Sequence, residues 1–212
     1  MGPETAGVYS ASAPMTAVIV GYLIGSLPLG LLLARGWSGV DPRRVGSGNP
    51  GATNVYRAAG WGLGLSVMAL DMAKGTGAVL LATRAGVSDG TTVAAGVAAV
   101  LGHVFPLWLR GRGGKGVATA CGAFAVLAPL ATLAALVTFV VTVAATRLVS
   151  AGSLVATLTL PSVAAVTGAP AAVTLGALTT AALIAWRHHG NLRRLRAGTE
   201  RRLRRPAGRP DA

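Results

Sequence analysis

The chain has 212 residues, of which 52% are hydrophobic and only 12% are charged. Its mean hydropathy is +0.61. A soluble domain of this length needs more polar surface, so the composition excludes an ordinary soluble protein and predicts an all-α integral membrane protein. The single Cys121 excludes an internal disulfide framework, and no Cys/His cluster indicates a metal site or a cofactor.

The formal net charge of +13 is typical of nucleic-acid-binding proteins. The basic residues of this chain, however, cluster at the ends of apolar runs. This placement follows the positive-inside rule of membrane proteins and does not form a stripe that tracks phosphates. Membrane lipid is therefore an expected partner, and nucleic acid is not.

Apolar stretches with few or no charges recur along the chain and predict about seven short transmembrane helices. The expected helices are 13–34, 61–83, 91–109, 117–128, 130–146, 151–167 and 170–186. The fourth and fifth are separated only by a break at Pro129, since proline removes a helix hydrogen bond and clashes with the preceding turn. Without that break, residues 117–146 would form one tilted span.

The distribution of positive charge favours the break. With it, all Lys and Arg residues except Lys74 and Arg84 follow the first, third, fifth or seventh stretch and lie on one side. The positive-inside rule then places the N-terminus outside and the C-terminus in the cytoplasm. We therefore expect an extracytoplasmic N-terminus at 1–12, a seven-helix membrane domain at 13–187, and a basic cytoplasmic tail at 188–212 whose start contributes to the site.

Four polar segments lie on the expected cytoplasmic side. In the first, 41–57, glycines alternate with small hydrogen-bonding residues, a composition typical of backbone N–H groups that converge on an anion. In the second, 102–119, four glycines surround Lys115 at the start of a helix, which also favours anions. The second segment is not a nucleotide-binding P-loop, because Leu109 and Gly116 stand where that motif needs Gly and Ser or Thr.

The third and fourth polar segments are shorter. The third contains Ser150 and Ser153 at a turn between two spans, and the fourth runs from His188 to Glu200 after the last helix. His188 and Asn191 are three residues apart, a spacing that places both on one helical face. The arginines from Arg196 onward are explained by a basic helix that lies on anionic lipid.

Three further ionisable residues lie within or beside predicted spans. Asp71 and Lys74 are three apart on one face of the second helix. Charges inside a membrane indicate function, but mutual neutralisation explains this pair equally well, so both interpretations stay open. His103, at the end of the third helix, fits a structural histidine better than a catalytic one.

Five motifs of this chain resemble, in order, those of the bacterial acyl-phosphate:glycerol-3-phosphate acyltransferase family (PlsY). They are GSLPLG, DPRRVGSGNPGATN, GHVFPLWLRGRGGKGVAT, TRLVSAGS and HHGNLRRLRAGTE, and they span residues 25–200. The HxxxxD motif of other glycerol-phosphate acyltransferases is absent. His189 departs from the pattern, since the family usually has Arg there, and this puts one local phosphate or lipid contact in doubt.

The resemblance implies transfer of a fatty acyl group from acyl phosphate to the primary hydroxyl of glycerol 3-phosphate, giving lysophosphatidic acid and inorganic phosphate. It implies no cofactor, a bacterial cytoplasmic membrane location with the site facing the cytoplasm, and functional coupling to the enzyme that makes acyl phosphate. The candidate catalytic residues are Ser47, Lys115 and His188. The candidate substrate- and phosphate-binding residues are Ser47, Gly48, Asn49, Gly51, Asn54, Arg57, Gly113, Gly114, Lys115, Ser150, Ser153 and Asn191.

Two questions stay open at this point. An acyl phosphate is a mixed anhydride, so the enzyme needs only to hold two phosphates, orient the hydroxyl and stabilise the developing oxyanion. The proton of the hydroxyl can go to His188 or to a substrate phosphate. A transporter of an anionic phosphate metabolite is the alternative function. Acyl-chain preference and oligomeric state do not follow from the sequence.

Overall fold

The computed structural model describes residues 12–203, and in this range it is built of helices without β-strands. The predicted N-terminal segment 1–12 lies outside the described residues except for Ser12, as does the tail from residue 204 onward. The α-helices are α1 (Ala13–Ser26), α2 (Leu29–Ser38), α3 (Ala52–Ala59), α4 (Trp61–Arg84), α5 (Asp89–Val104), α6 (Val117–Leu127), α7 (Pro129–Thr146), α8 (Val149–Val166), α9 (Ala171–Arg187) and α10 (His189–Arg196). Two 3-10 helices, η1 (Pro42–Arg44) and η2 (Leu107–Leu109), lie in loops.

The helix break at Pro129 is confirmed. Helix α6 ends at Leu127, and Pro129 is the first residue of α7, a position where its missing N–H costs no hydrogen bond. All seven apolar stretches contain helix, so the all-α prediction for these segments is also confirmed.

The predicted boundaries were wrong at two other prolines. The expected helix 13–34 is divided at Leu27 and Pro28 into α1 and α2. The expected helix 91–109 ends at Val104, because Phe105 precedes Pro106 and has φ −121° and ψ 64°, outside the helical region. Neither α3 nor η2 was predicted.

Five helical stretches in the described range are long and apolar enough to cross a membrane: 13–38 (α1 with α2), 61–84, 89–109, 129–146 and 149–166. Helices α6 and α9 are apolar but have only 11 and 17 residues. The outward faces are themselves apolar; Leu158, for example, is 68% exposed. Helices that are apolar on both their inner and outer faces are expected in a bilayer.

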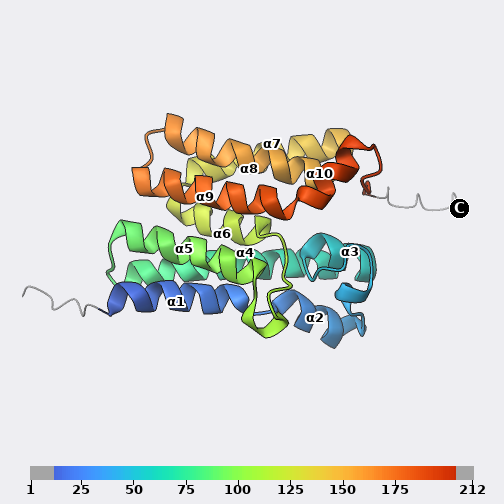
Figure 1. Cartoon of the computed structure of the whole chain (residues 1–212), viewed down its shortest axis with the longest axis horizontal. Helices are drawn as coiled ribbons and strands as arrows, with labels where there is room; N and C mark the ends of the chain where they lie inside the picture. Colours follow the sequence, from blue (N-terminus) through green and yellow to red (C-terminus); the bar gives the residue numbers. More distant parts are fainter. Residues whose placement is uncertain (1–11, 204–212) are drawn as a thin grey trace, which may run out of the picture.

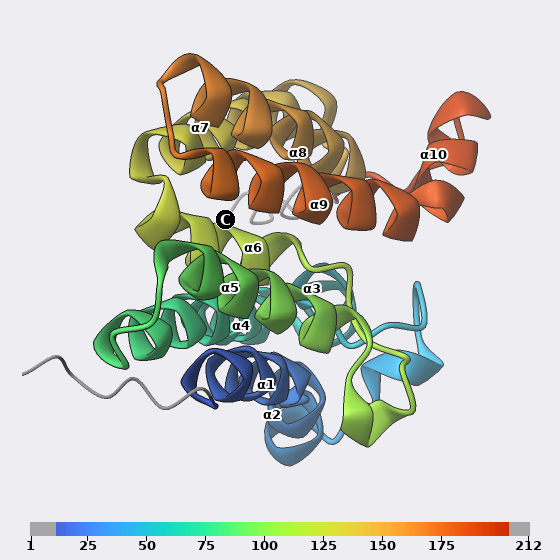
Figure 2. The same cartoon turned by 60° about the vertical axis from the view of Figure 1, so that its left-hand side comes forward.

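The helices pack in two layers (Figures 1 and 2). One layer holds α1 to α5, the other holds α7 to α10, and α6 lies between them. Small residues permit the closest contacts: a Cβ added at Gly75 of α4 or at Gly122 of α6 would collide with a backbone carbonyl of the other helix. Such glycines allow membrane helices to approach closely. The largest hydrophobic cluster lies where the layers meet and includes Val100, Phe124 and Ile184.

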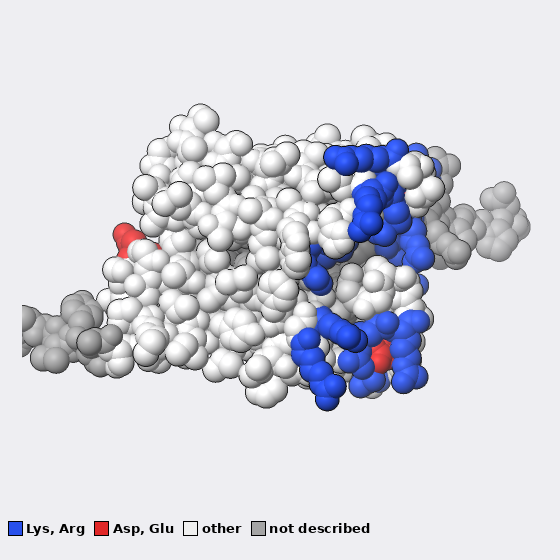
Figure 3. All heavy atoms as spheres, viewed as in Figure 1, with Lys and Arg blue, Asp and Glu red and all other residues white. Residues whose placement is uncertain are grey.

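Lys and Arg side chains gather at one end of the molecule, around α2, α3 and α10, whereas the middle of the visible face is almost free of charge (Figure 3). An uncharged belt with a basic end is the pattern expected of a membrane protein that follows the positive-inside rule. The four polar segments meet at this basic end.

Candidate active site

A cavity of about 750 Å³ lies between the two helix layers and receives residues from all four polar segments. Of the predicted site residues, the following line it: Ser47, Gly48, Asn49, Gly51, Asn54, Arg57, Gly113, Lys115, Ser150, Ser153, His188 and Asn191. Gly114 is the one predicted site residue that does not. The fold thus brings together segments that are far apart in sequence. For example, the Arg57 guanidinium donates a hydrogen bond to the carbonyl oxygen of Arg201, 144 residues later (3.2 Å).

The first segment is organised around Asn54, which is 1% exposed. Its Nδ2 donates to the carbonyl oxygens of Pro42 (2.6 Å), Val45 (3.0 Å) and Asn49 (2.9 Å), and its Oδ1 accepts from the Ser47 N–H (3.0 Å). Because the amide is engaged with the backbone on both sides, Asn54 fixes the curvature of the loop. The turn at Gly46 and Gly48, whose φ values are 63° and 70°, completes that curvature and suits glycine.

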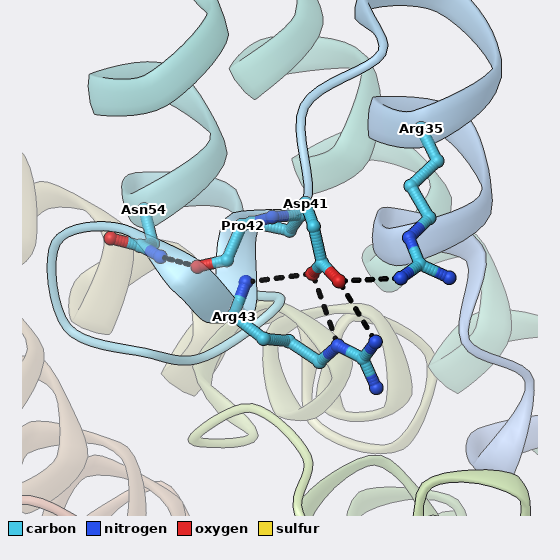
Figure 4. Close-up of polar contacts among 5 residues, drawn as sticks. All are labelled: Arg35, Asp41, Pro42, Arg43 and Asn54. Carbon is cyan, nitrogen blue, oxygen red and sulfur yellow. Dashed lines mark hydrogen bonds and ion pairs between the residues drawn. The ribbon is translucent and has the colours of Figure 1, made fainter.

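The start of the same segment is held by Asp41 (Figure 4). Its carboxylate accepts from Arg43 Nη2 (2.8 Å), from the Arg43 N–H (3.0 Å) and from Arg35 Nη2 of α2 (2.6 Å). The hydrogen bond from the Arg43 side chain is the main reason that the pKa of Asp41 lies well below its usual range. This exposed cluster anchors the loop to α2, although sequence analysis did not single it out.

Lys115 is joined to the fourth segment by a chain of polar contacts. Its Nζ donates to Asn191 Oδ1 (2.6 Å), the Asn191 Nδ2 donates to Glu200 Oε1 (2.7 Å), and Arg194 Nε donates to Glu200 Oε2 (2.8 Å). Burial lowers the pKa of Lys115 to about 8, and Glu200 opposes this shift. Most Lys115 side chains therefore remain cationic at pH 7.

Glu200 closes this chain of contacts. Burial alone would raise the pKa of Glu200, but the hydrogen bonds from Asn191 and Arg194 outweigh it and keep the pKa below its usual value. Glu200 was not predicted as a site residue. The sequence did offer one indication of its importance: Glu200 is the first acidic residue after Asp89, and it stands within a strongly basic segment.

Arg187, at the end of α9, was also missed. Its guanidinium donates to the carbonyl oxygens of Gly113 (3.2 Å) and Gly114 (3.2 and 3.3 Å). It also lines the cavity. Arg187 therefore ties the loop before α6, which carries Lys115, to the helix that ends beside His188.

His188 is 2% exposed and lies at the junction of α9 and α10. Its Nδ1 is 2.8 Å from the Ile184 carbonyl oxygen, which only accepts, so Nδ1 carries the hydrogen and Nε2 has a free lone pair. Burial, and then the charge of Lys115, lower its pKa to about 4. His188 is thus a neutral hydrogen-bond acceptor at pH 7.

Ser150 and Ser153 come from the first two turns of α8 and are both buried. Ser153 Oγ donates to the Val149 carbonyl (2.9 Å), which leaves its lone pairs as acceptors. His189 is exposed, and its Nδ1 contacts the Trp186 carbonyl (2.9 Å).

Away from the polar end, the cavity continues between α6, α7, α8 and α9. Its wall there is largely apolar and includes Val117, Leu136, Phe139, Leu160 and Ile184. A cationic, hydrogen-bonding end joined to an apolar passage suits a molecule with a phosphate and a hydrocarbon chain.

Residues 15–198 match the family model described as glycerol-3-phosphate acyltransferase. Glycerol-3-phosphate acyltransferases of Geobacter sulfurreducens and Myxococcus xanthus are 48% and 49% identical, over 87% and 88% of this chain and 95% and 97% of their own.

Two solved structures of PlsY (YgiH), an integral membrane glycerol 3-phosphate acyltransferase, share the fold. The glycerol 3-phosphate form has a TM-score of 0.86 at 38% identity, and the lysophosphatidic acid form has 0.84 at 37%; each covers 91% of this chain and 96% of its own. The family match at residues 15–198 contains the residues that line the cavity, except Glu200 and Arg201. The chain belongs to the glycerol-3-phosphate acyltransferase family.

Proposed function

We propose that this membrane acyltransferase transfers a fatty acyl group from acyl phosphate to the primary hydroxyl of glycerol 3-phosphate. The products are lysophosphatidic acid and inorganic phosphate. The proposal rests on one continuous cavity whose cationic end meets an apolar passage. The forms in which the PlsY neighbour was solved, with glycerol 3-phosphate and with lysophosphatidic acid, support the acceptor and the product.

Each end of the cavity has a distinct role in this proposal. Lys115 and Arg57 bind phosphate through charge, and backbone N–H groups between Ser47 and Gly51 supply further donors. The passage between α6 and α9 takes the acyl chain. Both substrates are thereby held with the hydroxyl beside the acyl carbonyl, which converts a bimolecular step into a unimolecular one.

The reaction needs no covalent enzyme intermediate. The hydroxyl oxygen attacks the acyl carbonyl carbon, and collapse of the tetrahedral intermediate breaks the bond between that carbon and the phosphate oxygen. Inorganic phosphate leaves with the electron pair. Lys115 and the N–H groups stabilise the negative charge that develops on the oxyanion and the leaving group.

His188 orients the hydroxyl by accepting its hydrogen bond at Nε2. A pKa of about 4 makes this imidazole a weak proton acceptor near neutral pH. Phosphate oxygens, whose second pKa is about 6, are stronger. We therefore propose that a phosphate oxygen of a bound substrate takes the proton.

The donor is tested by a direct comparison with purified full-length protein. Palmitoyl phosphate should support acylation of glycerol 3-phosphate without added metal or nucleotide, since the mixed anhydride supplies the leaving group. Palmitoyl-coenzyme A, assayed under the same conditions, should be at least about 100-fold less effective, the factor that roughly 2.7 kcal/mol of lost transition-state binding produces. Equal rates with the two donors would contradict the proposed donor.

We also propose seven membrane crossings in a bacterial cytoplasmic membrane, with the N-terminus outside and the active site facing the cytoplasm. Helices α6 and α9 supply the two short crossings, and the basic end of the molecule supports the orientation. A periplasm-active reporter fused after Thr167 should be active, and the same reporter fused after Arg196 should be inactive. Activity after Arg196 would mean that the tail is periplasmic and that the orientation is wrong.

A further inference from the structure

A buried charged cluster lies in the wall of the cavity, which Asp71 and His103 line, and it has no role in the proposed chemistry. Asp71 and Lys74 of α4 and His103 of α5 are 3%, 5% and 9% exposed. Lys74 Nζ is 2.9 Å from Asp71 Oδ1 and 3.1 Å from His103 Nδ1, and His103 Nδ1 is 3.4 Å from Asp71 Oδ1. Mutual neutralisation of Asp71 and Lys74 is thus real, but it does not explain where His103 lies.

On one side, the cluster holds the break between α1 and α2. Lys74 Nζ donates to the carbonyl oxygens of Gly25 and Leu27, both at 3.1 Å. These carbonyls lie at the end of α1, where Pro28 prevents the helix from continuing and supplying N–H donors. The ammonium thereby has three oxygen partners, which makes its burial tolerable.

On the other side, the cluster supports the loop that carries Lys115. The Gly114 N–H donates to the His103 carbonyl (3.1 Å), and the Gly113 N–H donates to the Val104 carbonyl (3.2 Å). The imidazole itself lies against Gly114: a Cβ added there would meet His103 Nε2, Cε1 and Cδ2. Gly114 is therefore a glycine because it packs on His103, and not because it lines the cavity.

We propose that Asp71, Lys74 and His103 form a positioning unit that fixes the loop of Gly113 and Gly114 and, through it, the place of Lys115 at the phosphate end of the cavity. Nδ1 of the imidazole faces both Lys74 and Asp71, where it accepts from the ammonium or donates to the carboxylate according to its tautomer, and the Nε2 edge supports the loop. Arg187 holds the carbonyl oxygens of the same two glycines, so the loop is fixed from α5 and α9 together. The role of this unit in catalysis rests on the proposed function, whereas its role in fixing the loop of Gly113 and Gly114 does not.

Two replacements of His103 separate the positioning role from charge neutralisation. Gln reaches as far as Nε2 and keeps a polar group against Gly114, whereas Asn reaches only as far as Nδ1 and keeps the contacts with Asp71 and Lys74. Hydrogen exchange of the backbone N–H groups of Gly113 and Gly114 reports on the loop without any assay of activity. His103→Asn should accelerate that exchange about 10-fold, and His103→Gln should leave it within about 2-fold of the unchanged protein. The opposite order, or no change in either variant, would overturn the proposal.

A cycle of variants then tests whether the unit acts through Lys115. His103→Asn should lower kcat/KM for glycerol 3-phosphate about 10-fold in the parent protein but less than about 2-fold when Lys115→Gln is already present, since residues that act as one unit are not additive. Equal effects in both backgrounds would overturn the link to Lys115. If the parent protein were inactive, the proposed function would be contradicted but the positioning of the loop would not, because hydrogen exchange measures the loop without an assay of activity.

Matched variants keep both measurements interpretable. Val93→Ala, a buried position at the other end of α5 and away from the cavity, should lower Tm without accelerating loop exchange or changing kcat/KM by more than about 2-fold. If His103→Asn does not accumulate in the membrane, Gly114→Ala perturbs the same contact from the loop and should show the same exchange and the same loss of additivity with Lys115→Gln. Additive effects of Gly114→Ala would count against the proposal in the same way.

Discussion

Replacing Lys115 by Gln is expected to lower kcat/KM by roughly 10- to 150-fold, because a charge-assisted hydrogen bond in a partly desolvated site is worth about 1.5–3 kcal/mol. Gln keeps most of the side-chain stem but ends one atom earlier and carries no charge, so the loss reports on the charged hydrogen bonds of the Lys115 ammonium. The same change removes the Lys115 charge, the second cause of the lowered pKa of His188, so that pKa should rise above about 4, while burial, the larger cause, still keeps it below 6.5. Steady-state kinetics and NMR titration of the imidazole measure the two effects.

Arg110→Gln is the matched control for Lys115→Gln. Arg110 belongs to the same loop, carries the same charge and is exposed, so its replacement should change kcat/KM by less than about 2-fold, as expected for a surface charge. If Lys115→Gln, correctly inserted, kept full specific activity, Lys115 would serve only as a topology charge.

His188→Ala is expected to lower kcat by about 100-fold, because it removes the hydrogen bond that orients the attacking hydroxyl and a misplacement of about 1 Å can cost that factor. Its neighbour gives the control: His189→Ala should have little effect, because His189 is exposed and its contacts are with the carbonyl and the ring of Trp186. His188→Ala should insert into the membrane normally, because the substitution removes one buried side chain and leaves α9 and α10 otherwise unchanged.

The pH profile decides what His188 does. If a substrate phosphate takes the proton, activity should fall as pH drops below about 6, the second pKa of phosphate, in both the parent and His188→Ala. If His188 were the base, the variant would lose the acidic limb, and the proposed role of the phosphate would be wrong.

His188 also makes stability depend on pH. Its folded pKa of about 4 is below the unfolded value of 6.5, so the unfolded chain binds a proton that the folded chain excludes between these values. The free energy of unfolding should therefore fall as pH drops from 6.5 to 4, and His188→Ala should remove that slope. Thermal unfolding measured across this window reports the difference.

Much of the site could be predicted from the sequence because its residues lie in short segments whose composition is chemically specific. Glycines around Lys115, and Ser and Asn within 46–54, indicate anion binding without knowledge of the fold. The distribution of positive charge then placed the four segments on one side, and the cavity joins them. The helix break at Pro129 was predicted correctly because the distribution of Lys and Arg residues along the chain favoured it.

The parts that were missed depend on contacts between distant residues. Pro28 divides α1 from α2, but proline within an apolar run does not by itself decide between a kink and a break, because membrane helices tolerate it. Arg187 and Glu200 were not predicted as site residues, because their partners follow only from the fold: Arg187 of α9 meets the loop before α6, and Glu200 turns back to Asn191 of α10. Likewise, the reason for Gly114 is the imidazole of His103, which is 11 residues earlier in the chain.

The cavity is proposed to perform acyl transfer and not to pass its ligand across the membrane. Purified protein in vesicles, given labelled glycerol 3-phosphate and palmitoyl phosphate, tests it directly. We predict that lysophosphatidic acid and inorganic phosphate form in equal amounts and that neither forms when glycerol 3-phosphate is omitted. Entry of unchanged glycerol 3-phosphate into the vesicle lumen, with no lysophosphatidic acid formed, would contradict the account and indicate a transporter.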